Sequence, residues 1–262
     1  MRIALFDSGL GGLTVLSHAR RVFPTEEFLF YADRDHVPYG TKAVGEVRAY
    51  VRDALHFLVE TQRAEAVLIA CNTATSVAAD EMRRRYDVPI IGMEPAVKKA
   101  LDADGRRRIL VAATPITVRG EKLRRLIEEY DKDGLIDLLA LPQLVEFAER
   151  EEFVSPRVEA YLRDALAPFA LERCSTIVLG CTHFNYFKDT LRRLLPQTMG
   201  FTDGNEGTIE ELARRIGIPS VPAGAEKAPC TFFDSGRLIT GTEAIARLER
   251  SIERAERMAQ IR

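Results

Sequence analysis

Two cysteines occupy matching places in the chain, and their surroundings suggest acid/base chemistry. Cys71 and Cys181 each follow an apolar run that ends in a small residue, and each leads towards a segment with helical character. The positive end of a helix lowers the pKa of a thiol and favours the thiolate. Most cysteines are instead small buried hydrophobic residues, and we expect that role for Cys174 and Cys230. The matched pair is therefore predicted to be functional.

Polar residues lie close to both thiols in the sequence. Asn72, Thr73 and Thr182 follow the cysteines and offer amide, hydroxyl and backbone donors near each sulfur. Asp7 and Ser8 precede a glycine-rich turn at the start of an expected helix, a setting that favours a bound carboxylate or phosphate. A helix N-cap is a simple explanation for Ser8, whereas Asp7 would repel an anion and needs another role.

Two cofactor-binding alternatives are weakened by the spacing of these residues. A dinucleotide fingerprint would require a glycine where Thr14 stands, so we expect no nicotinamide site. His183 lies two residues after Cys181, but structural zinc requires four ligands at recognisable spacings. No Cys-x-x-Cys or His-x-x-x-His motif accompanies this pair, and we expect no metal. The remaining histidines are expected on the surface or on helix faces: His18, His36 and His56.

Alternating apolar runs and amphipathic segments must position these side chains. Strands are predicted at 3–6, 28–31, 66–70, 89–91, 109–112, 136–139, 176–179, 201–202 and 231–233. Helices are predicted at 13–23, 44–58, 73–85, 118–128, 155–172, 186–195 and 209–216, with a last one running through residue 255. Repeated strand–helix units predict an α/β fold with parallel sheets covered by helices on both faces. Ligands in such sheets bind at the carboxyl ends of the strands.

The two cysteine segments suggest an internal duplication. Cys71 and Cys181 lie about one domain apart, so we expect two similar doubly wound lobes. Residues 1–97 with 208–262 are predicted to form the lobe that carries Asp7 and Cys71, and residues 98–207 the lobe that carries Cys181 and His183. Chain boundaries are expected near 102–108 and 202–207.

Composition restricts the class of protein. The 262 residues are 46% hydrophobic and 29% charged, with a net charge of -2, which is ordinary for a globular chain and unfavourable for nucleic-acid binding. No apolar stretch has the length of a membrane span, and no export signal is recognised. We therefore expect a cytoplasmic protein without membrane or nucleic-acid partners, whose four cysteines are reduced thiols.

Together these motifs resemble those of bacterial glutamate racemases. The resemblance rests on residues 6–15, Asp33 with 37–40, residues 70–74, Glu94–Pro95 and residues 179–183, which occur in that family's order and spacing. It covers roughly residues 2–216. The resemblance implies two α/β lobes with the active site in the cleft between them, and racemisation of glutamate without pyridoxal phosphate or metal. It also implies a small-molecule substrate, a role in supplying D-glutamate for peptidoglycan, and a homodimer.

The resemblance assigns roles to individual residues. Cys71 would act on the D-isomer with help from Asp7, and Cys181 on the L-isomer with help from His183 and Glu149. Two acid/base groups must flank an α-carbon that is inverted without a cofactor, and thiols titrate close enough to neutrality for this work. The implied substrate-binding residues are Ser8, Asp33, Pro38, Tyr39, Gly40, Asn72, Thr73, Thr117 and Thr182.

The chain also departs from the family's usual motifs. Ala32–His36 stands where the family usually has Gly-Asp-Thr-Ala-Arg, and Phe184–Tyr186 replaces Tyr-Pro-Leu. Residues 203–208 are similar to, but differ from, the family's Asp-Ser-Gly-Glu-Ala-Thr. None of these changes removes a proton-transfer residue. The alternatives are an aspartate or other amino-acid racemase of the same superfamily, and a non-catalytic module that binds an anion or a metal.

Overall fold

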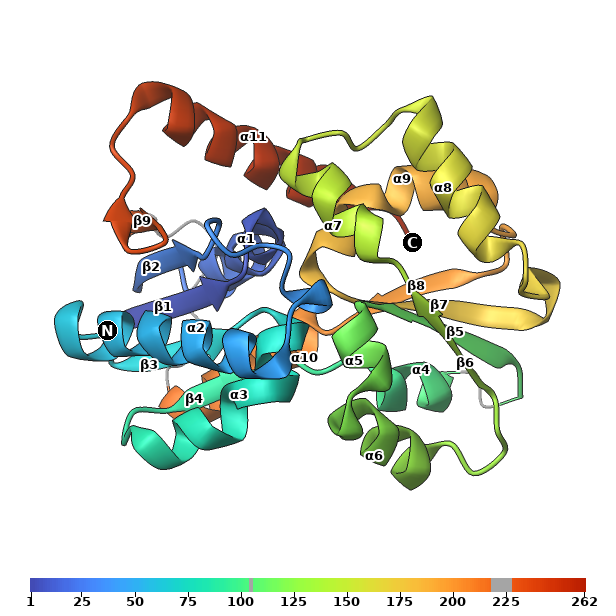
Figure 1. Cartoon of the computed structure of the whole chain (residues 1–262), viewed down its shortest axis with the longest axis horizontal. Helices are drawn as coiled ribbons and strands as arrows, with labels where there is room; N and C mark the ends of the chain where they lie inside the picture. The colour runs from blue at the N-terminus through green and yellow to red at the C-terminus, as the bar shows by residue number, and fades with distance from the viewer. Residues whose placement is uncertain (104–105, 218–227) are drawn as a thin grey trace.

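Two separate parallel β-sheets organise the chain. A computed structural model describes residues 1–103, 106–217 and 228–262. Within these residues, one sheet has the strand order β10-β9-β2-β1-β3-β4 and the other has the order β6-β5-β7-β8. The two sheets lie in different halves of the molecule, each with its own helices (Figure 1). The predicted α/β class with two parallel-sheet regions is confirmed.

The first sheet carries helices on both faces. Its strands are β1 (Arg2–Asp7), β2 (Glu27–Ala32), β3 (Ala66–Ile69), β4 (Ile90–Gly92), β9 (Cys230–Asp234) and β10 (Arg237–Leu238). One face packs against α2 (Val44–His56) and α3 (Asn72–Arg85), and the other against α1 (Leu13–Val22), α10 (Asn205–Ile216) and α11 (Thr242–Met258). A π-helical turn, η3 (Phe57–Thr61), extends α2. The inward-facing residues of β1 alternate between these two cores, with Ala4 and Phe6 in one and Ile3 and Leu5 in the other.

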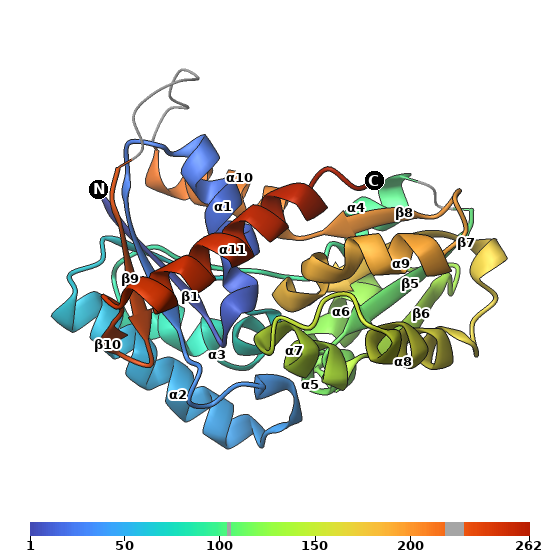
Figure 2. The same cartoon turned by 90° about the horizontal axis from the view of Figure 1, so that it is seen from above.

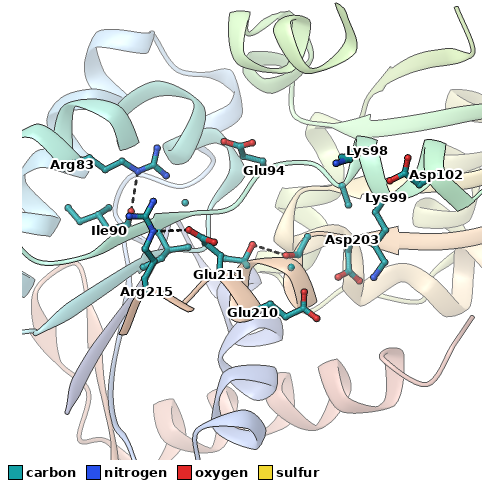
Figure 3. A pocket seen from close by; sticks show the side chains of 16 residues that line it. Arg83, Ile90, Glu94, Lys98, Lys99, Asp102, Asp203, Glu210, Glu211 and Arg215 are labelled. Carbon is teal, nitrogen blue, oxygen red and sulfur yellow. Dashed lines mark hydrogen bonds and ion pairs between the residues drawn. The ribbon is translucent and has the colours of Figure 1, made fainter. Parts of the chain in front are cut away.

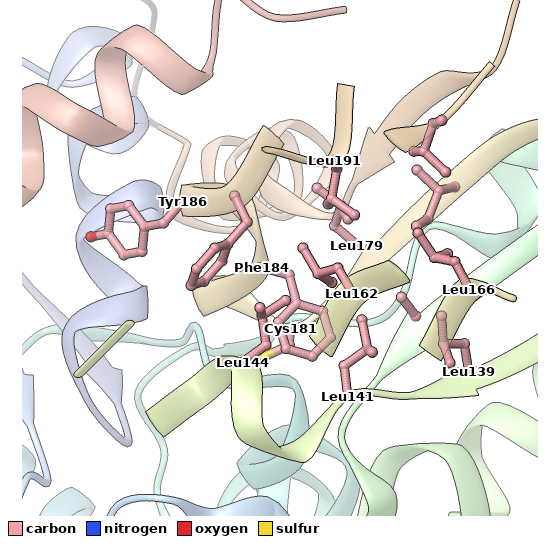
Figure 4. Packing of buried hydrophobic residues seen from close by; sticks show 14 of the residues in the cluster. Leu139, Leu141, Leu144, Leu162, Leu166, Leu179, Cys181, Phe184, Tyr186 and Leu191 are labelled. Atoms are coloured by element: carbon pink, nitrogen blue, oxygen red, sulfur yellow. The ribbon is translucent and has the colours of Figure 1, made fainter. Parts of the chain in front are cut away.

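The second sheet is built in the same way. Its strands are β5 (Arg108–Ala113), β6 (Ile136–Ala140), β7 (Cys174–Gly180) and β8 (Gly200–Asp203). The helices α7 (Pro142–Glu149), α8 (Pro156–Leu166) and α9 (Lys188–Leu194) cover one face, and α4 (Val97–Ala103) and α6 (Glu121–Tyr130) the other. Figure 4 shows Cys181 beside Leu144 at the edge of the first of these cores.

The two sheets share one strand order in their parallel cores. The strand order β2-β1-β3-β4 in the first sheet corresponds, strand by strand, to the order β6-β5-β7-β8 in the second. Cys71 follows β3 and Cys181 follows β7, so the two cysteines follow equivalent strands of the two sheets. This agreement is what an internal duplication produces, because each copy of a doubly wound unit keeps its crossover order.

After β8 the chain returns to the first sheet. Helix α10 packs against α1 and β4, and α11 packs against α1 and the 3-10 segment η5 (Thr182–Phe187) of the second sheet (Figure 2). The strands that precede residue 97 and follow residue 229 therefore belong to one sheet. The expected boundary at 102–108 includes residues 104–105, which lie outside the described part of the chain.

Several element predictions need correction. The helix predicted at 118–128 is two helices, α5 (Pro115–Arg119) and α6, because Gly120 between them is extended at φ -72° and ψ 141°. The helix predicted at 155–172 ends at Leu166, two residues before Pro168, and a 3-10 turn η4 (Leu171–Arg173) follows. The start of the helix predicted at 186–195 is the 3-10 segment η5. The sequence analysis missed α4, α7 and β10, and β10 pairs antiparallel with β9 in an otherwise parallel sheet.

Candidate active site

The glycine-rich turn after β1 contacts the second half of the molecule directly. A Cβ atom on Gly9 would lie 2.0 Å from Glu149 Oε1, and one on Gly11 would lie 2.3 Å from Thr182 Oγ1. The turn forms a short 3-10 helix, η1 (Leu10–Gly12), and the backbone N–H of Leu10 donates to Glu149 Oε1 at 2.6 Å. The sequence predicted that this turn binds a carboxylate, and here the carboxylate is the protein's own Glu149.

Cys71 is held at the start of α3 as a neutral thiol. Its sulfur accepts a hydrogen bond from the backbone N–H of Ala74 at 3.5 Å, and its thiol donates to Ser8 Oγ at 3.5 Å. Only 5% of Cys71 is exposed. Burial raises the pKa of the Cys71 thiol to about 12, the charge of Asp7 adds to the rise, and the two hydrogen bonds oppose it. The expected lowering of this pKa by the helix N-terminus was wrong, because desolvation outweighs the helix dipole.

Asp7 lies at the end of β1 and is completely buried. Its Oδ1 accepts from the backbone N–H of Gly9 at 3.0 Å, and its Oδ2 accepts from the Thr182 hydroxyl at 3.1 Å. Burial raises the pKa of Asp7 to about 6, although the nearby His183 and both hydrogen bonds favour the charged form. A carboxyl group that titrates near neutrality can accept and return a proton under physiological conditions.

Cys181 lies beside a histidine–glutamate pair. The Cys181 sulfur is 3.8 Å from His183 Nδ1, and His183 Nε2 is 2.8 Å from Glu149 Oε1. Burial disfavours a charge on His183, but the contacts with Cys181 and Glu149 prevail and raise its pKa well above the ordinary value. Burial likewise acts against ionised Glu149, yet its pKa is lowered by His183, the Leu10 N–H and Arg34. Both pKa directions favour an imidazolium next to a carboxylate, and an imidazolium can donate a proton to the sulfur.

Hydrogen bonds lead away from each thiol, and the covalent link between Ser8 and Asp7 joins the two sets. From Cys71 the path runs through Ser8 and its neighbour Asp7 to the Thr182 hydroxyl. Thr182 Oγ1 is 3.4 Å from His183 Nδ1, the nitrogen that faces the Cys181 sulfur. All four cysteines are free thiols. The structure thus places one thiol beside a carboxyl group and the other beside an imidazolium.

A threonine cluster joins the two halves next to Cys71. Thr73 Oγ1 on α3 lies 2.8 Å from Thr114 Oγ1 and 3.5 Å from Thr117 Oγ1 at the start of α5. Both side-chain polar atoms of the neighbouring Asn72 are buried without a partner in the described residues. Buried polar atoms of this kind are available to a ligand. Thr114 was not predicted, and its only signal is its place between the end of a strand and Pro115.

The Pro38–Gly40 segment closes the other side of this cluster. A Cβ atom on Gly40 would lie 2.5 Å from Thr114 Cβ. Pro38 precedes the 3-10 turn η2 (Tyr39–Thr41), and the Tyr39 hydroxyl donates to Asp33 Oδ2 at 2.5 Å. The structure therefore brings the predicted substrate-binding residues to the edge where the two sheets meet, although Asp33 contacts Tyr39 rather than a thiol.

Residues outside the site agree in part with the sequence analysis. Cys174, the first residue of β7, is buried in the core of the second sheet, and Cys230 is half-buried. His56 is exposed, whereas the ring of His36 stacks on Tyr50 with centroids 3.8 Å apart. Within residues 1–103, 106–217 and 228–262, no cluster of three or more His, Cys, Asp or Glu side chains could hold a metal ion. None of the described helices is long and apolar enough to cross a bilayer.

A pocket of about 630 Å³ lies elsewhere, at the end of β4 between α4 and α10 (Figure 3). None of the predicted site residues lines it. Its charged side chains include Arg215, which is paired with Glu211, and Arg83, which donates to the carbonyl oxygen of Ile90. Both arginines are thus bonded within the protein.

Comparisons with known proteins identify similar chains. A family model described as Asp/Glu/hydantoin racemase matches residues 14–227. A glutamate racemase from Campylobacter curvus (strain 525.92) is 48% identical over 268 residues, which cover 100% of both chains. Glutamate racemase 2 of Bacillus subtilis (strain 168) is 44% identical, over 97% of this chain and 96% of the relative. The crystal structure of glutamate racemase from Thermus thermophilus in complex with β-chloro-D-alanine is 30% identical and has a TM-score of 0.76, over 96% of this chain and 92% of that one.

Proposed function

Because the chain belongs to the Asp/Glu/hydantoin racemase family, we propose that Cys71 and Cys181 interconvert L-glutamate and D-glutamate by proton transfer on opposite faces of the α-carbon. The protein is an amino-acid racemase, and full-length similarity to glutamate racemases supports glutamate as its substrate. D-glutamate is a component of peptidoglycan, so the activity serves cell-wall synthesis. The observation that carries the two-thiol mechanism is the pair of thiol surroundings: Cys71 bonds to Ser8, the neighbour of Asp7, and Cys181 lies 3.8 Å from His183.

Conversion of L-glutamate begins at Cys181. The Cys181 thiolate removes the α-proton, and the electron pair of that C–H bond passes into the carbanion. Cys71 then delivers its thiol proton to the opposite face, and D-glutamate forms. The raised pKa of Cys71 supports this direction, because it keeps the proton on Cys71 until the carbanion appears.

Conversion of D-glutamate uses the same groups in reverse. The Cys71 thiolate removes the α-proton, and the Cys181 thiol returns one to the other face. Asp7, with a pKa of about 6, accepts the proton that Cys71 must lose. The His183 imidazolium supplies the proton that Cys181 must hold, and Glu149 keeps that imidazolium charged.

Substrate recognition is assigned to the polar residues around the thiols. The unpartnered amide of Asn72 and the hydroxyls of Thr73 and Thr117 are placed to bind the carboxylates and the ammonium group. Ser8, Asp33, Pro38, Tyr39, Gly40 and Thr182 complete the proposed binding set. Asp33 contributes through Tyr39, because its carboxylate accepts the hydrogen bond that the Tyr39 hydroxyl donates.

The organisation of the protein in the cell is proposed on separate grounds. Residues 1–97 with 208–262, and residues 98–207, are proposed as two domains, supported by the separate sheets. A homodimer is proposed from the family resemblance, and sedimentation velocity tests it. A mechanism that needs two reduced thiols supports a cytoplasmic location, where disulfides are rare.

The test follows L-glutamate in deuterium oxide by circular dichroism and by α-deuteration. A two-thiol enzyme places deuterium in the D-glutamate product while the early unreacted L-glutamate stays protiated. L-aspartate in a parallel reaction distinguishes an aspartate racemase. Equal deuteration of substrate and product at early times would contradict two separate acid/base groups.

Single variants separate the two thiols. Cys71→Ser and Cys181→Ser should each abolish racemisation, since inversion needs both faces. Elimination of chloride from a β-chloro amino acid needs proton removal on one face only. Cys181→Ser should therefore keep elimination from the D-analogue, and Cys71→Ser from the L-analogue. Cys174→Ser is the matched control, a buried cysteine outside the site that should keep racemase activity. Full racemisation by folded Cys71→Ser or Cys181→Ser would overturn the mechanism.

A further inference from the structure

Arg34 connects the catalytic histidine–glutamate pair to the first sheet. It lies in the turn after β2, where the resembling family usually has threonine. Its Nε is 3.7 Å from Glu149 Oε2 on α7, and its Nη1 donates to Asp234 Oδ2 at the end of β9 at 3.4 Å. One guanidinium therefore bridges Glu149 in the second half of the molecule and Asp234 in the first.

The two oxygens of Glu149 have different partners. Oε1 contacts His183 Nε2 and accepts from the Leu10 N–H, so its hydrogen-bonding positions are used. Oε2 faces Arg34. A carboxylate held at both oxygens cannot rotate away from the imidazole, and a nearby guanidinium favours its ionised form. The Nε atom of Arg34 is buried and makes no hydrogen bond within the described residues, so Glu149 Oε2 is its nearest charged partner there and holds it as an ion pair.

The β9–β10 hairpin fixes the turn that carries Arg34. Asp35 forms a bidentate pair with Arg237 at 2.7 and 2.8 Å, and its backbone N–H donates to the Ser235 hydroxyl. His36 contacts Asp33 through Nδ1 at 2.9 Å. The neighbours of Arg34 are thus held on both sides, and its side chain can reach Glu149 at little cost in conformational entropy.

Other charged groups also surround Glu149. Asp7 on β1 adds negative charge near His183, and Arg247 on α11 donates to the backbone carbonyl oxygen of Glu149. Asp7 and Glu149 are two carboxyl groups around one imidazolium. Besides His183 at Oε1, Arg34 is a cation that faces the side-chain carboxylate of Glu149, and it offsets the excess negative charge there.

We propose that Arg34 is a positioning residue, which holds the Glu149 carboxylate against His183 and so keeps His183 charged as the proton donor to Cys181. The proposal rests on the proposed racemase function for its kinetic consequences. Its electrostatic consequence, the protonation of His183, does not depend on the substrate.

Arg34→Met removes the charge and keeps much of the side-chain length. We expect kcat to fall about fivefold, the equivalent of roughly 1 kcal/mol for a partly exposed ion pair, while KM changes less than twofold. Arg34→Lys should restore part of the loss. Elimination from β-chloro-L-alanine, which needs the Cys181 thiolate, should fall more than elimination from the D-isomer, because a less charged His183 stabilises that thiolate less. Arg250→Met is the control. It removes another cation, which is paired with Glu151 between α7 and α8, and its kcat and KM should equal those of the unmodified protein.

Histidine-selective nitrogen NMR gives a readout that needs no activity. In Arg34→Met, His183 should lose its proton about 0.5 pH units lower than in the unmodified protein, while exposed His56 is unchanged. An unaltered His183 titration overturns the proposal, as does a rise in KM with kcat unchanged. If the unmodified protein does not racemise glutamate, the proposed function fails, and the NMR titration still decides the role of Arg34.

Discussion

Asp7→Asn should make the folded protein more stable while it damages catalysis. Asp7 is completely buried, and its pKa is about 6 against an ordinary value of 3.8. At about 1.36 kcal/mol per pH unit, the ionised carboxylate lowers the free energy of unfolding by about 3 kcal/mol above pH 6. As pH rises, Asp7 loses its proton at lower pH in the unfolded chain than in the folded protein. This loss of stability therefore develops between pH 3.8 and about pH 6. Asparagine has no charge to desolvate, and its amide can keep contacts with Gly9 and Thr182.

The gain in stability should therefore depend on pH. Urea unfolding at pH 7.5 should show Asp7→Asn more stable by up to about 3 kcal/mol, and the difference should shrink below about 1 kcal/mol at pH 4. Asp33→Asn is the matched control. Asp33 is also buried, but its carboxylate accepts from the Tyr39 and Ser235 hydroxyls and contacts His36, so asparagine should destabilise the protein. The reasoning is refuted if Asp7→Asn is less stable than the unmodified protein at pH 7.5 and the difference between the two is the same at pH 4.

The loss of activity in Asp7→Asn should mainly affect proton transfer on the face of the α-carbon that Cys71 serves. D- and L-glutamate have equal free energy, so kcat/KM must fall equally in both directions and cannot reveal the asymmetry. Elimination can. The base removes the α-proton of β-chloroalanine, chloride leaves, and the resulting aminoacrylate hydrolyses to pyruvate and ammonia. Asp7→Asn should slow chloride release from the D-isomer about 100-fold or more, the usual contribution of a general base, and from the L-isomer much less. Equal losses with both isomers would show that Asp7 does not serve Cys71.

Three further predictions address the rest of the site. Glu149→Gln should lower the pKa of His183, so the alkaline fall of kcat/KM should move to lower pH; an unchanged pH profile would contradict the ion pair. Gly11→Ala should destabilise the protein by roughly 1–3 kcal/mol in thermal unfolding, because its Cβ would lie 2.3 Å from Thr182 Oγ1, whereas Gly207→Ala, with open space at its Cβ, should cost less than 1 kcal/mol. Iodoacetamide should inactivate the enzyme, glutamate should protect it, and a chelator should leave activity unchanged; zinc-restored activity after chelation would contradict the metal-free mechanism.

Local sequence was sufficient for the strands that carry the chemistry. The apolar runs before Cys71 and Cys181 predicted β3 and β7, because a strand buried on both faces reads as a short continuous apolar segment. The same runs placed both cysteines at carboxyl ends, which the parallel sheets require to be the ligand edge. Asp7 was identified as unusual because a carboxylate beside an expected anion site would repel the ligand.

Helices with weak or interrupted patterns were harder to predict. The helix predicted at 118–128 runs across the break at Gly120, because a single glycine in a helical pattern does not by itself end a helix. Helix α7 is short and begins with Pro142, and its apolar residues do not differ from those of a loop packed on a core. Its position matters because it carries Glu149, which the sequence assigned only by resemblance.

Electrostatic roles were decided by the tertiary structure. A helix N-terminus predicted a lowered pKa for Cys71, but complete burial beside Asp7 raises it instead. Glu149, Leu10 and His183 are far apart in sequence and meet only where the two sheets join. Thr114 and Arg34 were not predicted as site residues, because their partners Thr73 and Glu149 lie in the opposite half of the molecule. The sequence determined which groups could carry protons, and the packing of the two halves determined their charge states, because burial and distance between charges are properties of the folded chain.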